Sequence, residues 1–246
     1  MIKMTPKNEK TYRNVPVNTK TKPSDLLFLS VLIFFTLFVE RILNRLIRGF
    51  FYDRISLGNL GWTLVLRGLC CLAWGFFVVF FLRCARKNCQ FDLLKSGEPL
   101  TKWHYLLSVL LAVAFVAYNI IDNIVQKSYN FSRYGDVWSN IVGNVSAYLF
   151  YAFDAAIVFL VIALAQNAFD LWMKKNEAGS KLLLYIPFGG VVLGLLQSAV
   201  NLMTGGGWLS VLVLLCMDLI FGVVYVAAGK KTTLAFPLLL LMFLSV

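Results

Sequence analysis

Long apolar runs are the feature that most limits what this chain can fold into. A helix needs about 20 residues to cross a hydrocarbon core of roughly 30 Å. Five runs meet that length, at 60–83, 104–125, 139–168, 182–203 and 208–228. A less regular first segment begins at Leu26, and a short last one runs from Thr233 to Val246. We therefore predict an all-α, polytopic transmembrane bundle of about seven segments, whose first partner is the lipid bilayer.

Composition agrees with a membrane protein and argues against nucleic acid as a partner. Hydrophobic residues make up 59% of the sequence and charged residues only 14%, which is far from the balance of soluble domains. The net charge of +11 comes from Lys and Arg that flank the apolar runs. They form no patch interleaved with aromatic residues, as nucleic-acid binding would need.

The basic residues predict the topology. They concentrate in the tail 1–24, in the loop 83–102, around Lys174 to Lys181, and at Lys230 and Lys231, whereas the intervening loops carry few. The positive-inside rule then places the N-terminus in the cytoplasm. We predict a disordered basic cytoplasmic tail over 1–24 and one transmembrane helical domain over 25–246, in an integral, multi-pass protein.

Arg67, Asp154 and Asp218 are charged residues that fall inside the predicted membrane segments, away from the segment ends. Such groups usually face the bundle interior and pair with one another. Counting from the outer helix ends puts Arg67 and Asp218 at similar depths, so we predict a structural pair between them, with Asp154 as the other candidate partner. A proton or ion relay through the three residues is the functional alternative.

Small residues recur every four positions in the 182–203 segment, at Gly190, Gly194 and Ser198. This spacing places them on one helix face and lets a neighbouring backbone approach closely. We interpret them as a helix-packing face.

The sequence carries no intact catalytic or metal-binding motif. His104 is the only histidine, and it stands at the start of the 104–125 segment beside Trp103 and Tyr105. One histidine cannot supply a two-histidine metal site, and neither a Ser/His/Asp set nor a phosphate-binding glycine loop is present. We expect no metal and no cofactor.

The stretch from Leu184 to Gln197 nevertheless resembles the second motif region of the CAAX-protease and bacteriocin-processing (CPBP) family of intramembrane proteases. That family has Phe-x-x-x-His here, with Leu193 and Gln197 at those two positions. Farther on, Phe221 to Lys231 is similar to the family's glycine-tyrosine stretch and basic turn, and Pro237 introduces its last motif helix. The remaining motif positions of the family fall on Ala165, Gln166 and Asp170, and on Leu241 and Ser245.

The resemblance covers about residues 150–246. It implies the helical arrangement of the protease family without the side chains that catalyse hydrolysis. The family uses Glu and His to activate water, whereas Gln166 and Gln197 do not titrate and Leu241 has no ligand atom. It also requires a break or re-entrant bend within 139–171, because a continuous helix would hold Gln166 and Gln197 at opposite depths.

These observations favour a non-catalytic member of the family in a bacterial cytoplasmic membrane. It would act as a binding, accessory, immunity or scaffolding subunit for another membrane protein, a hydrophobic peptide or a lipid-linked ligand. An active endopeptidase with a non-standard site, using Asp154, Asp170 or Asp218, is one alternative. A transporter or channel subunit is the other.

Overall fold

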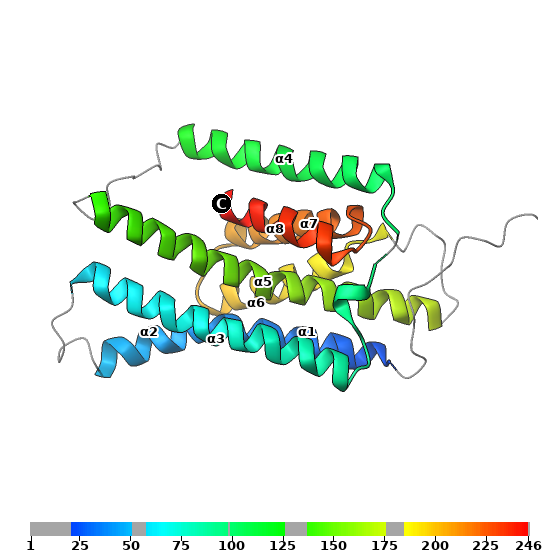
Figure 1. The fold of residues 1–246 in the computed structure, drawn as a ribbon, viewed down its shortest axis with the longest axis horizontal. Coiled ribbons are helices and arrows are strands. Elements are labelled where there is room, and N and C mark those ends of the chain that lie inside the picture. Colours follow the sequence, from blue (N-terminus) through cyan, green and yellow to red (C-terminus); the bar gives the residue numbers. More distant parts are fainter. Residues whose placement is uncertain (1–20, 51–57, 98, 126–136, 176–184, 246) are drawn as a thin grey trace, which may run out of the picture.

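The computed structural model describes residues 21–50, 58–97, 99–125, 137–175 and 185–245. Over these residues the chain forms α-helices joined by short turns, including the two 3-10 turns η1 and η2 (Figure 1). The predicted tail 1–24 lies outside the described residues up to residue 20, and the first helix already begins at Pro23. The elements are α1 (Pro23–Phe35), η1 (Thr36–Phe38), α2 (Val39–Phe50), α3 (Asn59–Lys87), η2 (Leu93–Lys95), α4 (Lys102–Val125), α5 (Val137–Lys175), α6 (Phe188–Met203), α7 (Trp208–Ala227) and α8 (Thr232–Ser245).

The helical membrane bundle predicted from the apolar runs is confirmed. Five helices of the described chain are long and apolar enough to cross a membrane: Pro23–Ile47, Leu60–Lys87, Lys102–Asp122, Val137–Lys175 and Trp208–Ala227. Two shorter apolar helices, α6 and α8, complete the bundle. The chain is therefore an integral, multi-pass membrane protein.

The segment predicted at 182–203 forms a shorter helix than expected. Helix α6 has 16 residues and begins at Phe188, directly after Pro187. A residue before proline is disfavoured in the helical region, so Ile186 cannot extend the helix backwards. At 1.5 Å per residue α6 spans only about 24 Å, less than the hydrocarbon core. Pro237, expected to introduce the last helix, instead lies inside α8.

Helix α5 is the central element of the bundle. It packs against α1, α3, α6 and α8, and its run from Ile157 to Ala165 is buried on every side. A helix that is apolar all round is stable only when neighbours enclose it, as they do here. Phe159 illustrates the packing, because its ring lies 5.8 Å from Tyr225 of α7 and 5.3 Å from Phe236 of α8.

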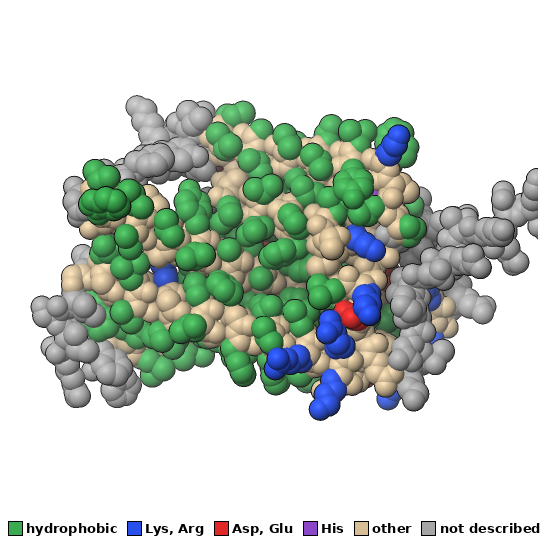
Figure 2. Space-filling view, in the orientation of Figure 1, with side chains coloured by type: hydrophobic (Ala, Val, Ile, Leu, Met, Phe, Trp, Pro, Cys, Tyr) green, Lys and Arg blue, Asp and Glu red, His purple; other side chains and the backbone are tan. Residues whose placement is uncertain are grey.

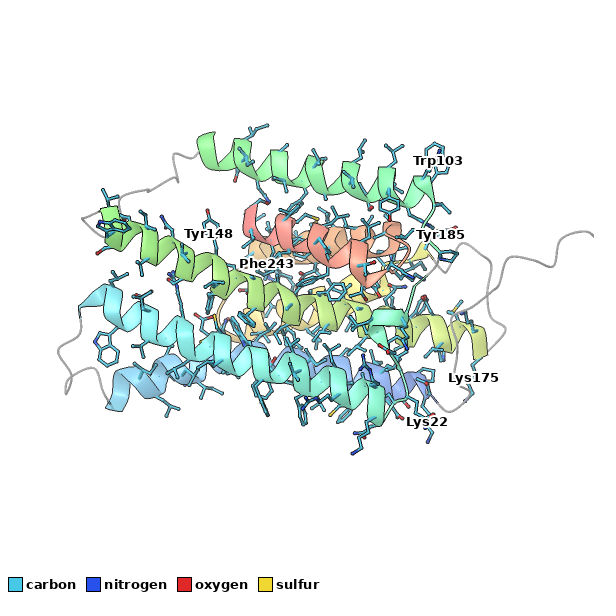
Figure 3. All side chains as sticks on the ribbon, in the orientation of Figure 1. Lys22, Trp103, Tyr148, Lys175, Tyr185 and Phe243 are labelled. Atoms are coloured by element: carbon cyan, nitrogen blue, oxygen red, sulfur yellow. The ribbon has the colours of Figure 1, made fainter. Side chains whose placement is uncertain are left out.

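Apart from α1 and α2, which run in the same direction, consecutive helices alternate in direction, and this gathers the basic residues at one end (Figure 1). The start of α1, the end of α3, the start of α4 and the end of α5 all lie at the right of Figure 1. Figure 3 shows Lys22, Trp103, Lys175 and Tyr185 at that end. In the space-filling view most of the visible Lys and Arg side chains gather there, while hydrophobic side chains are spread over the rest of the visible face (Figure 2). We call this the basic end.

Candidate functional site

A fully buried amide, Gln166 of α5, lies at the centre of the polar network near the basic end. Its Nε2 donates to the Ile186 carbonyl at 3.1 Å and to Asp170 Oδ1 at 3.2 Å. Its Oε1 accepts the backbone N–H of Gly189 at 3.1 Å. The N–H groups of a helix's first turn lack intrahelical partners, so this side chain satisfies one of them and joins the start of α6 to α5.

Asp170 lies one turn further along α5 and forms an ion pair with Lys230. Lys230 Nζ is 2.5 Å from Asp170 Oδ2, and the two side chains are only 9% and 14% exposed. Lys230 follows Gly229 in the turn after α7, and both residues have positive φ, 57° and 64°. This left-handed turn ends α7 and brings the lysine side chain back to α5.

The surrounding groups hold the same turn in place. Asn167 Nδ2 donates to the Tyr225 hydroxyl at 3.1 Å and to the Ala163 carbonyl at 2.7 Å. The η2 loop covers the turn, because Thr232 Oγ1 donates to the Leu93 carbonyl at 2.8 Å. A Cβ on Gly97, whose φ is 107°, would lie 2.7 Å from the Lys230 carbonyl oxygen. Glycine is therefore required for this close approach.

The chemistry of this network is that of a clamp. Asp170 accepts from a lysine through one oxygen and from an amide through the other, and Gln166 uses its donor and acceptor on backbone groups. A general base needs a lone pair that a substrate or water can reach, and in this network each oxygen of Asp170 already accepts one hydrogen bond. Within the described ranges, no three His, Cys, Asp or Glu side chains gather as a metal site would require.

His104 is held by the start of its own helix. Thr101 Oγ1 accepts from the His104 backbone N–H at 3.4 Å, while the Thr101 N–H donates to His104 Nδ1 at 3.2 Å. This reciprocal pair has the pattern of a capping box, with histidine in the place usually taken by Glu or Gln. The ring packs over the turn after α7, since a Cβ on Gly229 would lie 3.3 Å from Nδ1.

The motif positions suggested by the family resemblance are not all brought together. Gln166 and Asp170 are partners, but Gln197 lies eight residues beyond Gly189 on α6, about 12 Å deeper into the bundle. Leu241 is 59% exposed on the outside of α8. Ser245 ends α8, where its hydroxyl donates to the Met242 carbonyl at 2.7 Å and accepts from Asn119 Nδ2 at 3.0 Å.

The bend that would unite them is absent, because α5 is one continuous helix from Val137 to Lys175. The expectation of a break within 139–171 is wrong. The segment contains no proline and only one glycine, Gly143, near its start, so no residue type that commonly kinks a helix interrupts its hydrogen bonds.

The predicted pair between Arg67 and Asp218 is also wrong. Arg67 Nη1 donates to the Gly143 carbonyl and to Ser146 Oγ, each at 2.9 Å. These acceptors belong to α5, which packs on α3, whereas Asp218 lies on α7. Equal depth is not enough for pairing, because helix order in the bundle decides which side chains face each other.

Asp218 is instead buried in the contact between α6 and α7, where it is 3% exposed. Its Oδ2 has no hydrogen-bond partner among the described residues. Gly190 and Gly194 face it from α6: a Cβ on Gly190 would lie 3.0 Å from Gly222 Cα, and one on Gly194 would lie 3.1 Å from Leu215. Ser198 Oγ lies 3.5 Å from the Val211 carbonyl on the same face.

Asp154, the remaining intramembrane carboxylate, is half-buried on α5. The carboxylate of Glu40 on α2 lies within electrostatic range of it and carries charge of the same sign. The neighbours of Asp154 therefore differ from those of Arg67 and of Asp218, and the three residues of the proposed relay are not in contact with one another.

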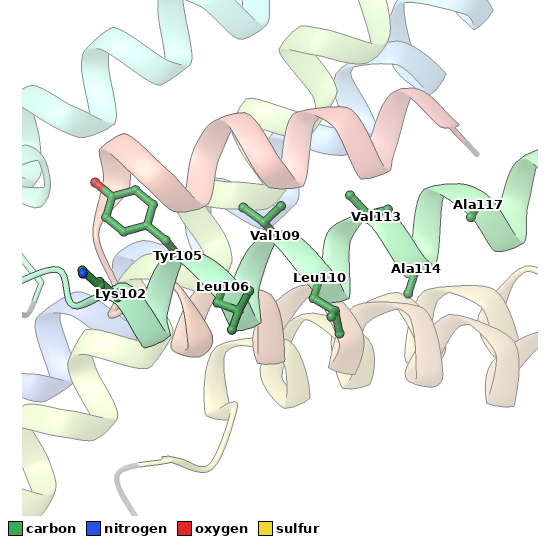
Figure 4. Close-up of a pocket in the computed structure, with 8 residues that line it drawn as sticks. All are labelled: Lys102, Tyr105, Leu106, Val109, Leu110, Val113, Ala114 and Ala117. Carbon is green, nitrogen blue, oxygen red and sulfur yellow. The ribbon is translucent and has the colours of Figure 1, made fainter.

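Two hollows mark the bundle surface. The larger, about 770 Å³, lies along α4, and all its described lining residues, from Lys102 to Ala117, belong to that helix (Figure 4). Leu106, Leu110 and Ala114 line it at helical spacing. The smaller, about 230 Å³, lies between η1, α2, α6 and α7 and contains Arg41, Gln197 and Asn201.

Sequence reasoning missed Lys230 and Arg41 as site residues. Lys230 was read only as a basic residue flanking a membrane segment, although it follows a glycine that can end a helix. No local pattern marks Lys230 or Arg41. Asp170, which pairs with Lys230, and Gln197, which lines the same cavity as Arg41, are distant from them in the sequence.

Comparisons with known protein families, with characterised proteins and with solved structures give no match to this chain. The class that the fold defines is a helical, multi-pass membrane protein, and its function has to be argued from the polar network and the cavities.

Proposed function

We propose that this chain is a non-catalytic membrane protein that acts as a binding, accessory or scaffolding subunit. The observation that carries the proposal is the buried Asp170–Lys230 pair, 2.5 Å apart. The ion pair engages the carboxylate of Asp170, which a hydrolytic site would need. It holds α5 to the turn between α7 and α8. The partner would be another membrane protein, a hydrophobic peptide or a lipid-linked ligand.

The likeness to the CPBP family belongs to this proposal. Gln166 and Asp170 stand at the family's first motif and occupy the centre of the polar network, which supports a shared outline. The alignment of Gln166 with Gln197 requires a break in α5, so the continuous α5 and the outward-facing Leu241 support neither that part of the alignment nor an assembled catalytic centre. An immunity or accessory role, suggested by the family's name, is the corresponding biological proposal.

Peptide cleavage is the direct test. Purified protein in neutral detergent is incubated with a mixture of fluorogenic peptides, alongside an Asp170→Asn variant. We expect both proteins to match the detergent blank, while affinity-tagged protein taken from its own membrane retains a partner in fixed ratio. Cleavage by the unmodified protein that disappears in Asp170→Asn would overturn the proposal in favour of an endopeptidase.

A transport role is a second candidate, favoured by Asp218, whose buried Oδ2 is unpartnered within the described residues. Intramembrane carboxylates of this kind occur in proton and ion pathways. Proteoliposomes containing a pH-sensitive dye test this role. Proton or cation flux that is lost in Asp218→Asn and retained in Arg86→Gln would favour transport over the subunit proposal.

The membrane orientation is part of the proposal. We place the basic end in the cytoplasm of a bacterial cell, because Lys and Arg favour that side. Lys95→Cys, in the exposed η2 loop at that end, should resist membrane-impermeant maleimide in intact cells and react in inverted vesicles. Labelling in intact cells would reverse the assignment.

A further inference from the structure

The smaller cavity has one apolar wall and one polar wall. Phe34, Phe38 and Leu214 contribute to the apolar wall, from α1, η1 and α7. The polar wall consists of Arg41 from α2 and Gln197 from α6, with Asn201 one turn further along α6. A cavity with this division suits a molecule that is itself amphipathic.

The guanidinium of Arg41 is the charged group among the residues that line the cavity, and no carboxylate of the described residues forms an ion pair with it. It lies over the Phe38 ring, 5.6 Å from the centroid, and forms no ion pair within the described part of the chain. Glu40, the preceding residue on α2, forms no ion pair with Arg41 among the described residues. Adjacent residues on a helix do not face each other, so Glu40 leaves the charge of Arg41 available.

The two amides extend this polar wall. Asn201 Nδ2 donates to Ser210 Oγ at 2.6 Å, which fixes its orientation. Gln197 is half-buried at the cavity and makes no hydrogen bond to the rest of the described chain. An arginine fork with an amide donor beside it is a favourable arrangement for a carboxylate or phosphate.

We propose that this cavity binds the anionic head group of an amphiphile, a carboxylate or a phosphate, with the start of its acyl chain against the apolar wall. This deepens the proposed binding function and rests on it. The volume of about 230 Å³ is below the 300–1,000 Å³ of pockets that enclose whole drug-sized ligands. The cavity therefore holds the head group and first methylenes, and the rest of the chain extends into the bilayer along exposed α1 and α2 residues such as Phe35 and Ile42.

The test compares one ligand with and without its charge. A fluorescently labelled stearate and its methyl ester are titrated into the purified protein in neutral maltoside micelles, and binding is followed by anisotropy. We expect the acid to bind about tenfold more tightly than the ester, as one charge-assisted interaction predicts. Arg41→Gln should abolish this difference, whereas Arg45→Gln, one turn away on α2 and outside the cavity lining, should preserve it.

Further measurements distinguish a lipid head group from a free anion, and further variants keep the test informative if Arg41→Gln fails to fold. Inorganic phosphate should not displace the labelled acid, whereas phosphatidylglycerol should. If Arg41→Gln fails to fold, Gln197→Leu should lower affinity for the acid, and Val200→Trp should fill the cavity and weaken both ligands.

Equal binding of acid and ester, or an equal loss in Arg45→Gln, would overturn the inference. Displacement by inorganic phosphate alone would also overturn it, in favour of a small-anion site. The readout contains no peptide bond, so failure here is independent of the cleavage assay that tests the proposed function.

Discussion

Two buried aspartates of this bundle have opposite surroundings. Asp170, near the end of α5, accepts from Lys230 and Gln166, whereas Asp218, in the middle of α7, has an oxygen without a partner in the described structure. The difference follows from position. At the basic end, turns supply a lysine and backbone groups, while the contact between α6 and α7 is so close that glycines occupy the facing positions.

The comparison separates two uses of a carboxylate in a membrane protein. Asp170 links helices, so its loss should weaken the fold. Oδ2 of Asp218 is buried without a hydrogen-bond partner among the described residues, which carries a desolvation cost. Measurements of stability can therefore distinguish the two residues without a known ligand.

The largest effect is expected from Lys230→Met. It leaves the carboxylate of Asp170 buried and uncompensated, which costs about 3–5 kcal/mol in buried pairs. Unfolding of the purified protein in mixed micelles, followed by circular dichroism, measures the change. Arg86→Met is the matched control, because Arg86 pairs with Asp92 at 3.2 Å with its side chain 61% exposed, where a pair contributes at most about 1 kcal/mol. Equal losses in the two variants would contradict the clamp.

The next effect is expected at the contact between α6 and α7. Gly190→Ala adds a Cβ against the backbone of Asp218 and Gly222, and overpacking of this kind costs about 1–3 kcal/mol. Gly68→Ala is the control, because nothing lies within 4 Å of a Cβ added there on α3. Alanine in that helix should instead stabilise by about 0.5–1 kcal/mol. A change in stability of the same sign in both variants would show that α6 and α7 pack less closely than the structure indicates.

A smaller effect of opposite sign is expected at the two aspartates themselves. Asp218→Asn replaces a buried carboxyl group, whose Oδ2 has no partner among the described residues, with a neutral amide, and stability should rise by about 1 kcal/mol. Asp170→Asn removes an ion-pair partner and should lower stability. The same unfolding assay compares them. A loss of stability in Asp218→Asn would mean that Asp218 has a partner in the folded protein and would end the contrast.

The fold was largely predictable because a helix that spans a membrane requires a long run of apolar residues. Uninterrupted apolar runs gave α3, α4 and α7 nearly to their ends, since a lipid-facing helix must be apolar along its length. The predicted start of α6 was wrong because the apolar run extends before Pro187, whereas the helix begins only after this proline. The length of α5 was underestimated because its last turns, near Lys174, extend past the apolar run.

The polar network was predictable only in its local part. Gln166 and Asp170 are four residues apart, and helical spacing alone brings them together. Lys230 reaches them from 60 residues away, through a turn whose position depends on the packing of α7 and α8. The wrong pairing of Arg67 has the same origin: depth along a helix can be counted from the sequence, but rotation and neighbour order cannot.

The smallest effect, and the sharpest check on neighbour order, concerns Arg67 and Asp218. Because Arg67 donates to Gly143 and Ser146 of α5, charge reversal at Arg67 should be additive with reversal at Asp218, within the roughly 0.3–0.5 kcal/mol seen for independent sites. The matched cycle pairs Arg67→Gln with Ser146→Ala, which share a hydrogen bond and should show coupling of at least about 0.5 kcal/mol. Rescue of the Arg67 reversal by the Asp218 reversal would require the two side chains to face each other. In that case α7 would approach α3 in the folded protein, and Asp218 would have a partner, as Asp170 does.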